Sequence, residues 1–324
     1  MNDRTAPVVI SCGEPAGIGP EIATKAWEAL KDAVPMAWMG DPRHLPSDAT
    51  WRAVLDMDEA RAVCGEALPV LVRGFDGHAE PGLIDPRNAQ GVVEVIAECV
   101  DLVRAGAASA LCTAPIHKKA LIDGADFRYP GHTEYLGALS GVERSVMMLA
   151  SDRLRVVPAT IHIPLSEVPG ALTPALLRET IEITVEALKT RFRIPAPRIA
   201  VAGLNPHAGE GGAIGPEETD WIAGLVTEMR GGGHDLSGPL PADTMFHAAA
   251  RESYDAAVCM YHDQALIPIK TLDFDRGVNV TLGLPFVRTS PDHGTAFDIA
   301  GKGIANPTSM IEALKLAARL AGRD

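Results

Sequence analysis

Short β-rich apolar runs alternate with helical patterns along most of this 324-residue chain. The predicted strands cover 8–10, 108–112, 156–161, 199–202, 256–260 and 278–282. Helices are predicted to open at Pro20 and at Thr173, and a third covers 88–104. Such alternation favours an α/β fold with a largely parallel sheet, because parallel strands need crossover helices between them.

The charge balance limits the partners that the protein can have. The chain carries 29 basic and 42 acidic residues, a formal net charge of -13. The resulting field repels nucleic acid and anionic membranes, so we expect neither as a partner. A small anionic substrate stays compatible with this composition wherever basic residues cluster locally.

Cysteines and apolar runs indicate the compartment. The five cysteines are odd in number and include no C-x-x-C pair, so buried thiols are expected, not disulfides or a thiolate zinc site. The N-terminal residues lack the apolar core of a secretion signal. No apolar run approaches the ~18 residues of a membrane span. We therefore expect a cytoplasmic protein.

Three histidines each follow a predicted strand: His162, His207 and His262. Ligands of open α/β sheets bind at the carboxyl ends of strands. Three imidazoles with an open fourth position are typical of a catalytic site for Zn²⁺ or a similar divalent ion. The separations of 45 and 55 residues (207 − 162 and 262 − 207) match no local metal motif. Each histidine could instead satisfy a local turn.

Two glycine-rich stretches were tested against nucleotide-binding motifs. Neither 13–21 nor 209–215 fits G-x-G-x-x-G or G-x-x-x-x-G-K-[ST], so Rossmann and P-loop sites are excluded. The first stretch lies between a strand and a helix, where backbone N–H groups can face a ligand. Tight turning explains these glycines about as well.

Basic and polar residues gather in a segment predicted as strand and loop, which contains Lys270, Arg276, Asn279 and Arg288. Such a cluster could hold a phosphate or a carboxylate, or it could be solvated edge-strand charge.

Two further polar pairs are candidates. His132 and Thr133 offer donors in a loop, unless Thr133 simply caps a helix. Asp243 is either a helix cap, an orienting carboxylate or a base.

Five ordered motifs resemble one known family. They are 13–21 (GEPAGIGPE), 131–134 (GHTE), 203–210 (GLNPHAGE), 261–264 (YHDQ) and 288–296 (RTSPDHGTA). Together they are similar to the 4-hydroxythreonine-4-phosphate dehydrogenases of pyridoxal phosphate biosynthesis, over nearly the whole chain. Residues 293–307 also resemble the adenosine-binding loop of isocitrate and isopropylmalate dehydrogenases, which bind NAD without a Rossmann fingerprint.

The resemblance implies an isocitrate/isopropylmalate dehydrogenase-like α/β fold of two domains with an interdomain cleft. The first domain would comprise 1–130 with 283–324. The second, 131–282, would carry much of the metal site and of a homodimer interface.

The resemblance also implies roles for individual residues. A divalent metal (Zn, Mg or Co) would be bound by His162, His207 and His262 across the homodimer interface. The substrate would be bound by His132, Thr133, Lys270, Asn279 and Arg288. NAD, or NADP, would be bound by His293, Gly294, Thr295, Ala296 and Asn306.

The implied reaction is oxidation of 4-phosphohydroxy-L-threonine by hydride transfer to NAD⁺. The β-keto acid formed would lose CO₂ to give 3-amino-2-oxopropyl phosphate. Asp243 and Lys270 are the candidates for taking the hydroxyl proton.

Three alternatives stay open at this point. A relative could oxidise threonate or erythronate 4-phosphate, or a dihydrodiol dicarboxylate, although Arg288 and Lys270 favour a phosphorylated substrate. A metal-dependent hydrolase would use the three-histidine ion to activate water, but the nucleotide-like tail disfavours it. A non-catalytic metal-binding or ligand-binding protein would need the ligands without an open position.

Overall fold

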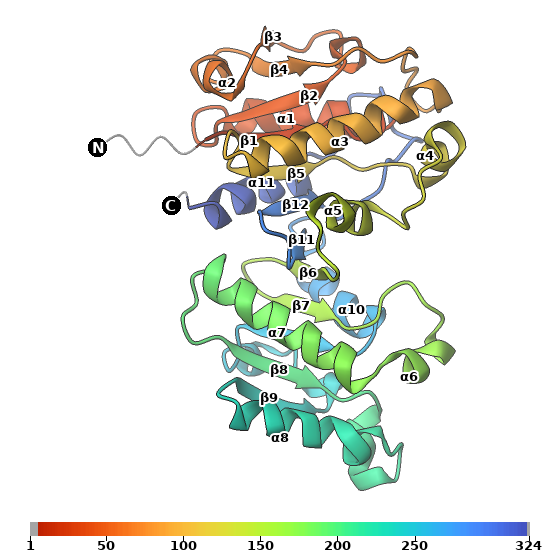
Figure 1. The fold of residues 1–324 in the computed structure, drawn as a ribbon, viewed down its shortest axis with the longest axis vertical. Helices are drawn as coiled ribbons and strands as arrows, with labels where there is room; N and C mark the ends of the chain where they lie inside the picture. Colours follow the sequence, from red (N-terminus) through yellow and green to blue (C-terminus); the bar gives the residue numbers. More distant parts are fainter. Residues whose placement is uncertain (1–5, 323–324) are drawn as a thin grey trace. The chain divides into compact units, whose positions relative to one another are not determined.

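The computed structural model describes residues 6–322 (Figure 1). The first five residues, part of the N-terminal stretch considered above, and the last two lie outside the described residues. The chain divides into unit 1, which runs up to Ser145 and resumes at Val278, and unit 2, Val146–Gly277. The chain thus leaves unit 1 at 145 and not at 130, and returns at 278 and not at 283. His132, Thr133 and Asn279 therefore belong to the same unit as Arg288.

Unit 1 is built on a mostly parallel sheet whose strands lie in the order β3-β4-β2-β1-β5-β12-β11. Only the β11–β12 pairing is antiparallel among these pairs. Its strands are β1 (Val8–Ser11), β2 (Met36–Gly40), β3 (Trp51–Val54), β4 (Leu68–Val72), β5 (Ala110–Thr113), β11 (Val278–Leu282) and β12 (Arg288–Pro291). The predicted parallel α/β arrangement is confirmed here.

Helices cover both faces of this sheet. They are α1 (Gly19–Leu30), α2 (Met57–Val63), α3 (Ala89–Arg104), α4 (Lys118–Ala125), α5 (His132–Ser140) and α11 (Thr308–Leu320), with short 3₁₀ turns η1 (Pro42–His44) and η2 (Pro86–Asn88). The crossovers through α1 and α3 run in opposite directions along the sheet, so right-handed connections place them on opposite faces. Figure 1 shows α3 in front, and α11 packs against α1.

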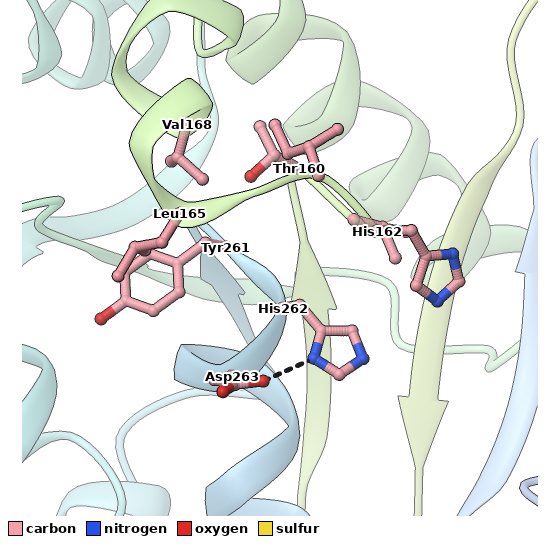
Figure 2. A pocket seen from close by; sticks show the side chains of 9 residues that line it. Thr160, His162, Leu165, Val168, Tyr261, His262 and Asp263 are labelled. Carbon is pink, nitrogen blue, oxygen red and sulfur yellow. Dashed lines mark hydrogen bonds and ion pairs between the residues drawn. The ribbon is translucent and has the colours of Figure 1, made fainter.

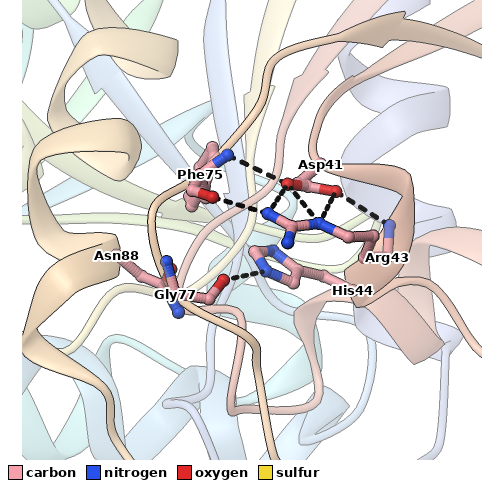
Figure 3. A network of polar contacts seen from close by, with 6 residues as sticks. All are labelled: Asp41, Arg43, His44, Phe75, Gly77 and Asn88. Atoms are coloured by element: carbon pink, nitrogen blue, oxygen red, sulfur yellow. Dashed lines mark hydrogen bonds and ion pairs between the residues drawn. The ribbon is translucent and has the colours of Figure 1, made fainter.

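A polar clamp fixes two loops at the carboxyl edge of this sheet (Figure 3). Asp41 is 2% exposed and accepts hydrogen bonds from Arg43 and from the Phe75 N–H at 2.9 Å. Burial alone would raise the pKa of Asp41, but these hydrogen bonds outweigh it and lower the pKa to about 2. The Gly77 N–H donates to Asn88 at 3.0 Å. The loops after β2 and β4 are thereby held in one conformation.

Unit 2 is a smaller, mostly parallel sheet in the order β6-β7-β10-β8-β9, with β6 antiparallel to β7. Its strands are β6 (Val146–Ala150), β7 (Arg155–Pro158), β8 (Arg198–Ala202), β9 (Asp235–Leu240) and β10 (Ala256–Cys259). Its helices are α6 (Val168–Ala171), α7 (Pro174–Thr190), α8 (Ala223–Gly231), α9 (Ala248–Arg251) and α10 (His262–Asp273). Short helical turns are η3 (Leu165–Glu167), η4 (Pro206–Gly212), the π-helical turn η5 (Glu218–Ile222) and η6 (Ala242–Thr244).

Several local predictions can be compared with the structure. The Thr173 hydroxyl caps α7 by accepting from the Leu176 N–H at 3.1 Å, as its sequence position predicts. Lys270 was expected in a strand or loop, and this was wrong: it lies in α10. The helix continues through Pro268, because the buried side chains Ala265, Leu266 and Ile269 anchor it to the core of unit 2. Packing therefore overrides the preference of proline for helix ends.

The cysteines and the helix lengths bear on two further predictions from the sequence. All five cysteines are buried and free of disulfide bonds, as expected. No helix within residues 6–322 has the length and apolarity required to cross a bilayer.

Candidate functional site

Two of the three histidines lie side by side in unit 2 (Figure 2). His162 follows β7 and His262 opens α10 directly after β10, and their ring centroids are 5.7 Å apart. Two imidazoles bound to one metal ion have centroids roughly 5–6 Å apart, given N–metal bonds of about 2 Å. The exits of both strands are joined just before these residues, since the Thr160 hydroxyl donates to the Met260 carbonyl at 2.7 Å.

A neighbouring carboxylate orients one ring of this histidine pair. His262 Nδ1 lies 2.7 Å from Asp263 Oδ1, which leaves Nε2 as the atom directed away from the helix. Carboxylate–histidine contacts of this kind fix ring orientation in metal sites. Gln264 then ties two strand exits together, because it accepts from the Met260 N–H at 2.7 Å and donates to the Gly203 carbonyl at 2.8 Å.

His207 stands on a turn of its own, η4, which follows β8. Its side chain is exposed, and its Nδ1 lies 3.5 Å from Glu210 Oε2. Residues 6–322 of a single chain contain no group of three or more histidine, cysteine, aspartate or glutamate side chains arranged to hold a metal. One chain therefore brings His162 and His262 together without completing a three-histidine site.

The backbone at these positions is unusual for residues other than glycine. His162 has φ 54° and His207 has φ 50°, both in the left-handed region. Such conformations cost of order 1–3 kcal/mol each and cluster at functional sites. The surrounding fold therefore holds the backbone of His162 and of His207 in a conformation that costs free energy.

A pocket of about 290 Å³ opens beside the histidine pair. It is lined by Thr160, Ile161, His162, Ile163, Leu165, Val168, Tyr261, His262 and Asp263. Figure 2 shows the two imidazoles on one side of it and Leu165, Val168 and Tyr261 on the other. The histidines therefore border an apolar wall with room for a small ligand.

Arg288 is the most unusual cation of unit 1. It begins β12, is 3% exposed, and donates to the hydroxyls of Thr281 at 2.9 Å and Thr113 at 2.6 Å. Burial lowers the pKa of Arg288 to about 10, so the guanidinium stays charged at neutral pH. Its Nε atom is enclosed without a partner, and no carboxylate bonds to it among the described residues. The negative charge of Glu134 acts on Arg288 without a hydrogen bond between the two among the described residues. A buried cation whose hydrogen bonds go to hydroxyls is suited to an anionic ligand.

His132 and Lys118 add to this site. His132 opens α5, and its Nε2 is enclosed without a partner. Desolvation, with the positive charges of Arg288 and Lys118, lowers the pKa of His132 well below its ordinary value, so the ring is neutral. Lys118 Nζ lies 3.6 Å from the point where a Cβ on Gly131 would stand. The ammonium group thus reaches the N-terminus of α5, the positive end of the helix dipole.

Thr133 and Asn279 complete the expected substrate contacts of unit 1. Thr133 lies within the first turn of α5, whose N-cap is Gly131, so it is not the cap that the local pattern offered as an alternative. Asn279 stands opposite Ser290 in the β11–β12 pairing, with its Oδ1 enclosed and unpaired. Because alternate residues share a face of a strand, Asn279, Thr281 and Arg288 project from the same side of this pair.

The loop predicted to bind the nucleotide is anchored on α1. Thr295 O accepts from the Ile18 N–H at 3.0 Å, and Glu21 accepts from the Ala305 N–H at 2.9 Å. The His293 Nε2 is enclosed without a partner, whereas Gly294 is exposed. The loop therefore presents an unsatisfied imidazole nitrogen from a fixed backbone.

The remaining residues of this loop take local roles. Ala296 has φ 46°, a left-handed conformation. Asn306 accepts from the Thr308 N–H at 3.0 Å and so fixes the start of α11. Neither observation by itself identifies a ligand.

The two candidate bases lie in unit 2. Asp243 is exposed in the turn η6, and within the described residues no hydrogen bond or ion pair joins it to the histidine pair. Lys270 is partly buried on α10, with its Nζ 5.6 Å from the centre of the Phe274 ring. The carboxylate that orients a histidine is Asp263, not Asp243.

Three residues of these sites were not assigned a role from the sequence: Lys118, Asp263 and Gln264. The last two lie inside the YHDQ motif, so their adjacency to His262 was the available signal. Lys118 has no motif of its own, and only the approach of its side chain to Gly131 reveals it.

Comparison with known proteins identifies the family. The family described as pyridoxal phosphate biosynthetic protein PdxA matches residues 28–317. The chain belongs to this family. The family that the five motifs indicated is thereby confirmed, together with the enzyme class, a dehydrogenase of pyridoxal phosphate biosynthesis.

Relatives and solved structures agree with this membership. A 4-hydroxythreonine-4-phosphate dehydrogenase of Roseobacter denitrificans is 70% identical over 324 residues, covering 100% of this chain and 99% of the relative. One from Ruegeria sp. is 65% identical, covering 99% and 98%. The crystal structure of the Klebsiella pneumoniae enzyme of that name matches with a TM-score of 0.88 at 37% identity, covering 99% of each chain.

A more distant structure has a different named activity. A terephthalate 1,2-cis-dihydrodiol dehydrogenase from Burkholderia xenovorans matches with a TM-score of 0.68 at 26% identity, covering 98% of each chain. The fold is therefore shared with an enzyme named for another substrate, and the substrate must be argued from the site.

Proposed function

We propose that this protein oxidises 4-phosphohydroxy-L-threonine with NAD⁺, giving a β-keto acid that decarboxylates to 3-amino-2-oxopropyl phosphate. The observation that carries this proposal is the buried Arg288, which has hydroxyl acceptors but no carboxylate partner among the described residues. A phosphate monoester supplies the missing negative charge, and a guanidinium binds it by two parallel hydrogen bonds.

The neighbouring groups fit the rest of such an anion. Neutral His132 can donate one hydrogen bond from Nε2, and Lys118 adds a point charge at the N-terminus of α5. Because these groups are in place before the ligand arrives, binding the phosphate requires little rearrangement, and the remainder of the substrate is held in one orientation. Thr133, Asn279 and, from unit 2, Lys270 are proposed as further substrate contacts.

The nucleotide is proposed to bind at His293, Gly294, Thr295, Ala296 and Asn306. The enclosed, unpaired His293 Nε2 and the loop tied to α1 support this site. When bound, NAD⁺ supplies the hydride acceptor. The chain's own contribution is a fixed loop that needs no Rossmann glycine motif.

A divalent ion is proposed to be held by His162, His207 and His262. The 5.7 Å spacing of two of the rings and the Asp263 contact fit a metal donor set. When bound, the ion supplies Lewis acidity that favours loss of the substrate hydroxyl proton. We assign that proton to Lys270 or Asp243, and the pH profiles of K270M and D243N separate the two.

We further propose a cytoplasmic homodimer in which a second subunit completes the metal site. The support is that a single chain places two histidines together but not three. Ile267 on α10 and Phe274, the residue that follows this helix, are 62% and 72% exposed, and a subunit interface would bury such side chains.

A second substrate class is favoured by one observation. The contacts proposed for Arg288, His132 and Lys118 are with the phosphate of the substrate and do not depend on its amino group. Threonate or erythronate 4-phosphate would satisfy the same contacts. The distant dihydrodiol dehydrogenase shows that the fold also serves a different substrate.

The test is NADH formation with 4-phosphohydroxy-L-threonine, threonate 4-phosphate and erythronate 4-phosphate, each with and without a chelator. We expect turnover of the amino substrate that stops when the metal is removed. Turnover of a non-amino substrate alone would keep the site and overturn the proposed pathway. Activity that persists after complete removal of metal would overturn the proposed role of the histidines.

A further inference from the structure

The turn that carries His207 is left-handed over five consecutive residues. From His207 (φ 50°, ψ 29°) to Gly211 (φ 66°, ψ 23°), every residue lies in the left-handed region, including Ala208 and Glu210. For residues other than glycine this conformation costs roughly 1–2 kcal/mol each. Contacts from elsewhere in the fold must therefore hold the turn.

Glu218 supplies these contacts. Its side chain is buried at 2% exposure, and Oε1 accepts from the Asn205 backbone N–H at 2.7 Å while Oε2 accepts from Asn205 Nδ2 at 2.9 Å. The same Oε2 lies 2.6 Å from the point where a Cβ on Gly209 would stand. The Glu218 carboxylate thus binds Asn205, where the turn begins, and packs against Gly209 in its middle.

The buried carboxylate of Glu218 is held by hydrogen bonds and, within residues 6–322, not by an ion pair with a basic side chain. No lysine or arginine pairs with the carboxylate in the part of the chain that the structure describes. Its hydrogen-bond donors come from Asn205, whose Nδ2 also donates to Glu217 Oε2 at 2.7 Å. Burying a carboxylate without a cation costs free energy, and the fold uses it where the strained turn needs support.

The local backbone is shaped around this contact. Glu218 opens the π-helical turn η5 at the start of α8, and π-helical turns are rare and concentrate at functional sites. Gly215 (φ 131°) allows the Asn205 amide to pack against it, since a Cβ there would lie 2.4 Å from Asn205 Nδ2. The glycine-rich stretch that matched no nucleotide motif therefore has a different purpose.

We propose that Glu218 is a positioning residue. It holds the left-handed turn from His207 to Gly211 through its contacts with Asn205 and Gly209, and thereby fixes the direction of the His207 imidazole toward a divalent cation. This inference rests on the proposed metal role of His207. It adds to that role a residue that touches neither metal nor substrate.

The test compares two substitutions with the same change in charge. In E218Q one of the two accepting oxygens becomes an NH₂ group that faces a donor, so one hydrogen bond is lost. In E217Q the amide oxygen can still accept from Asn205 Nδ2, so the contact survives. Co²⁺ is titrated into each metal-free protein, and its visible spectrum reports both affinity and coordination geometry.

We expect E218Q to weaken Co²⁺ binding by about 10- to 100-fold, as loss of an outer hydrogen-bond partner typically does. Its spectrum should change, and the amides of 207–211 should exchange hydrogen faster in the metal-free protein. E217Q should match the wild type. If E218Q does not fold, N205A removes the same side-chain contact and carries the same expectation.

The outcomes separate the two proposals. Wild-type Co²⁺ affinity and spectrum in E218Q, or equal losses in E217Q, overturn the positioning role. Undiminished Co²⁺ binding in H207A overturns the proposed metal role of His207. In that case faster exchange at 207–211 in E218Q still shows that Glu218 holds the turn.

Discussion

The proposed anion site of unit 1 and the proposed metal site of unit 2 differ in how complete they are within one chain. Arg288 is buried, held by two threonine hydroxyls and aimed before any ligand binds. His162 is exposed, and His207 stands on a separate turn. We expect the buried guanidinium of Arg288 to bind an anion without help from a second chain. We expect the exposed His162 and the partly buried His262 to bind a metal ion only after another ligand is added.

The largest expected effect tests whether the metal site is shared between subunits. H162A, H207A and H262A should each abolish turnover, because a three-ligand site loses its ion. Two inactive variants are refolded together, and their substituted histidines serve one metal site from different subunits. About a quarter of wild-type activity should then return, because half of the dimers are hybrids and each hybrid has one intact site out of two. The NADH assay on all three pairwise mixtures measures this.

The mixtures also contain their own control. Two histidines that share a chain cannot complement each other, so at least one pair should stay inactive after mixing. If no pair regains activity, the three ligands come from one chain, and the contrast between the two units disappears.

The second prediction removes the buried cation. R288M should lower kcat/KM for a phosphorylated substrate by roughly 30- to 5,000-fold, because truncating one partner of a buried charge pair costs about 2–5 kcal/mol. The ligand-free variant should keep its Tm or gain stability, since an uncompensated buried charge is removed. Inorganic phosphate should raise the Tm of the wild type but not that of R288M.

A different result for R288M would contradict the proposed role of Arg288. A marked fall in Tm with unchanged KM would show that Arg288 supports the fold and does not bind substrate. R288K serves as the control, because it keeps the charge but loses the planar pair of donors.

Two groups of strands differ in how well the sequence predicts them. Strands such as β1 and β10 are short apolar runs, and they were predicted within one or two residues. β2 (Met36–Gly40) is a short, fully buried apolar run, but it was not among the predicted strands. β12 is made of Arg288–Pro291 and has no apolar pattern. It is a strand because β5 and β11 pair with it, and pairing is not local information.

The sites follow the same division. His262 and Arg288 stand inside ordered motifs, so the resemblance could propose roles for them. Lys118 stands in no motif, and the role proposed for it depends on its side chain reaching Gly131 at the start of α5. Lys270 was assigned to a strand or loop with the rest of its segment, whereas α10 stays helical through Pro268 and includes it.

The third prediction concerns the pH dependence of unit 1. The folded protein keeps His132 neutral, whereas the unfolded chain takes up a proton below the ordinary pKa of 6.5. Stability from this residue is therefore fully present above that pH and is lost as the pH falls further, at up to about 1.4 kcal/mol per pH unit. H132Q should reduce this slope in urea unfolding followed by tryptophan fluorescence between about pH 5 and 7.

Part of the slope should survive in H132Q. Burial also lowers the pKa of His44. This histidine therefore makes the folded protein less stable as the pH falls, as His132 does. H44Q is the matched variant, and the two reductions should add because each histidine titrates in its own surroundings. An unchanged slope in H132Q would contradict this, because it would show that His132 takes up its proton equally in the folded and the unfolded protein.

The smallest expected effect separates two adjacent lysines on α4. Lys118 reaches the start of α5 and shifts the pKa of His132, whereas Lys119 pairs with Asp123 at 2.8 Å. K118M should raise KM for the phosphorylated substrate by roughly 3- to 10-fold and weaken the salt dependence of binding, because an exposed cation acts through a screened field. K119M should leave both unchanged, although it removes the same charge from the same helix. Equal effects in the two variants would mean that only the net charge of α4 matters. The anion site would then consist of the groups around Arg288 alone, and its completeness within one chain would depend on a single buried side chain.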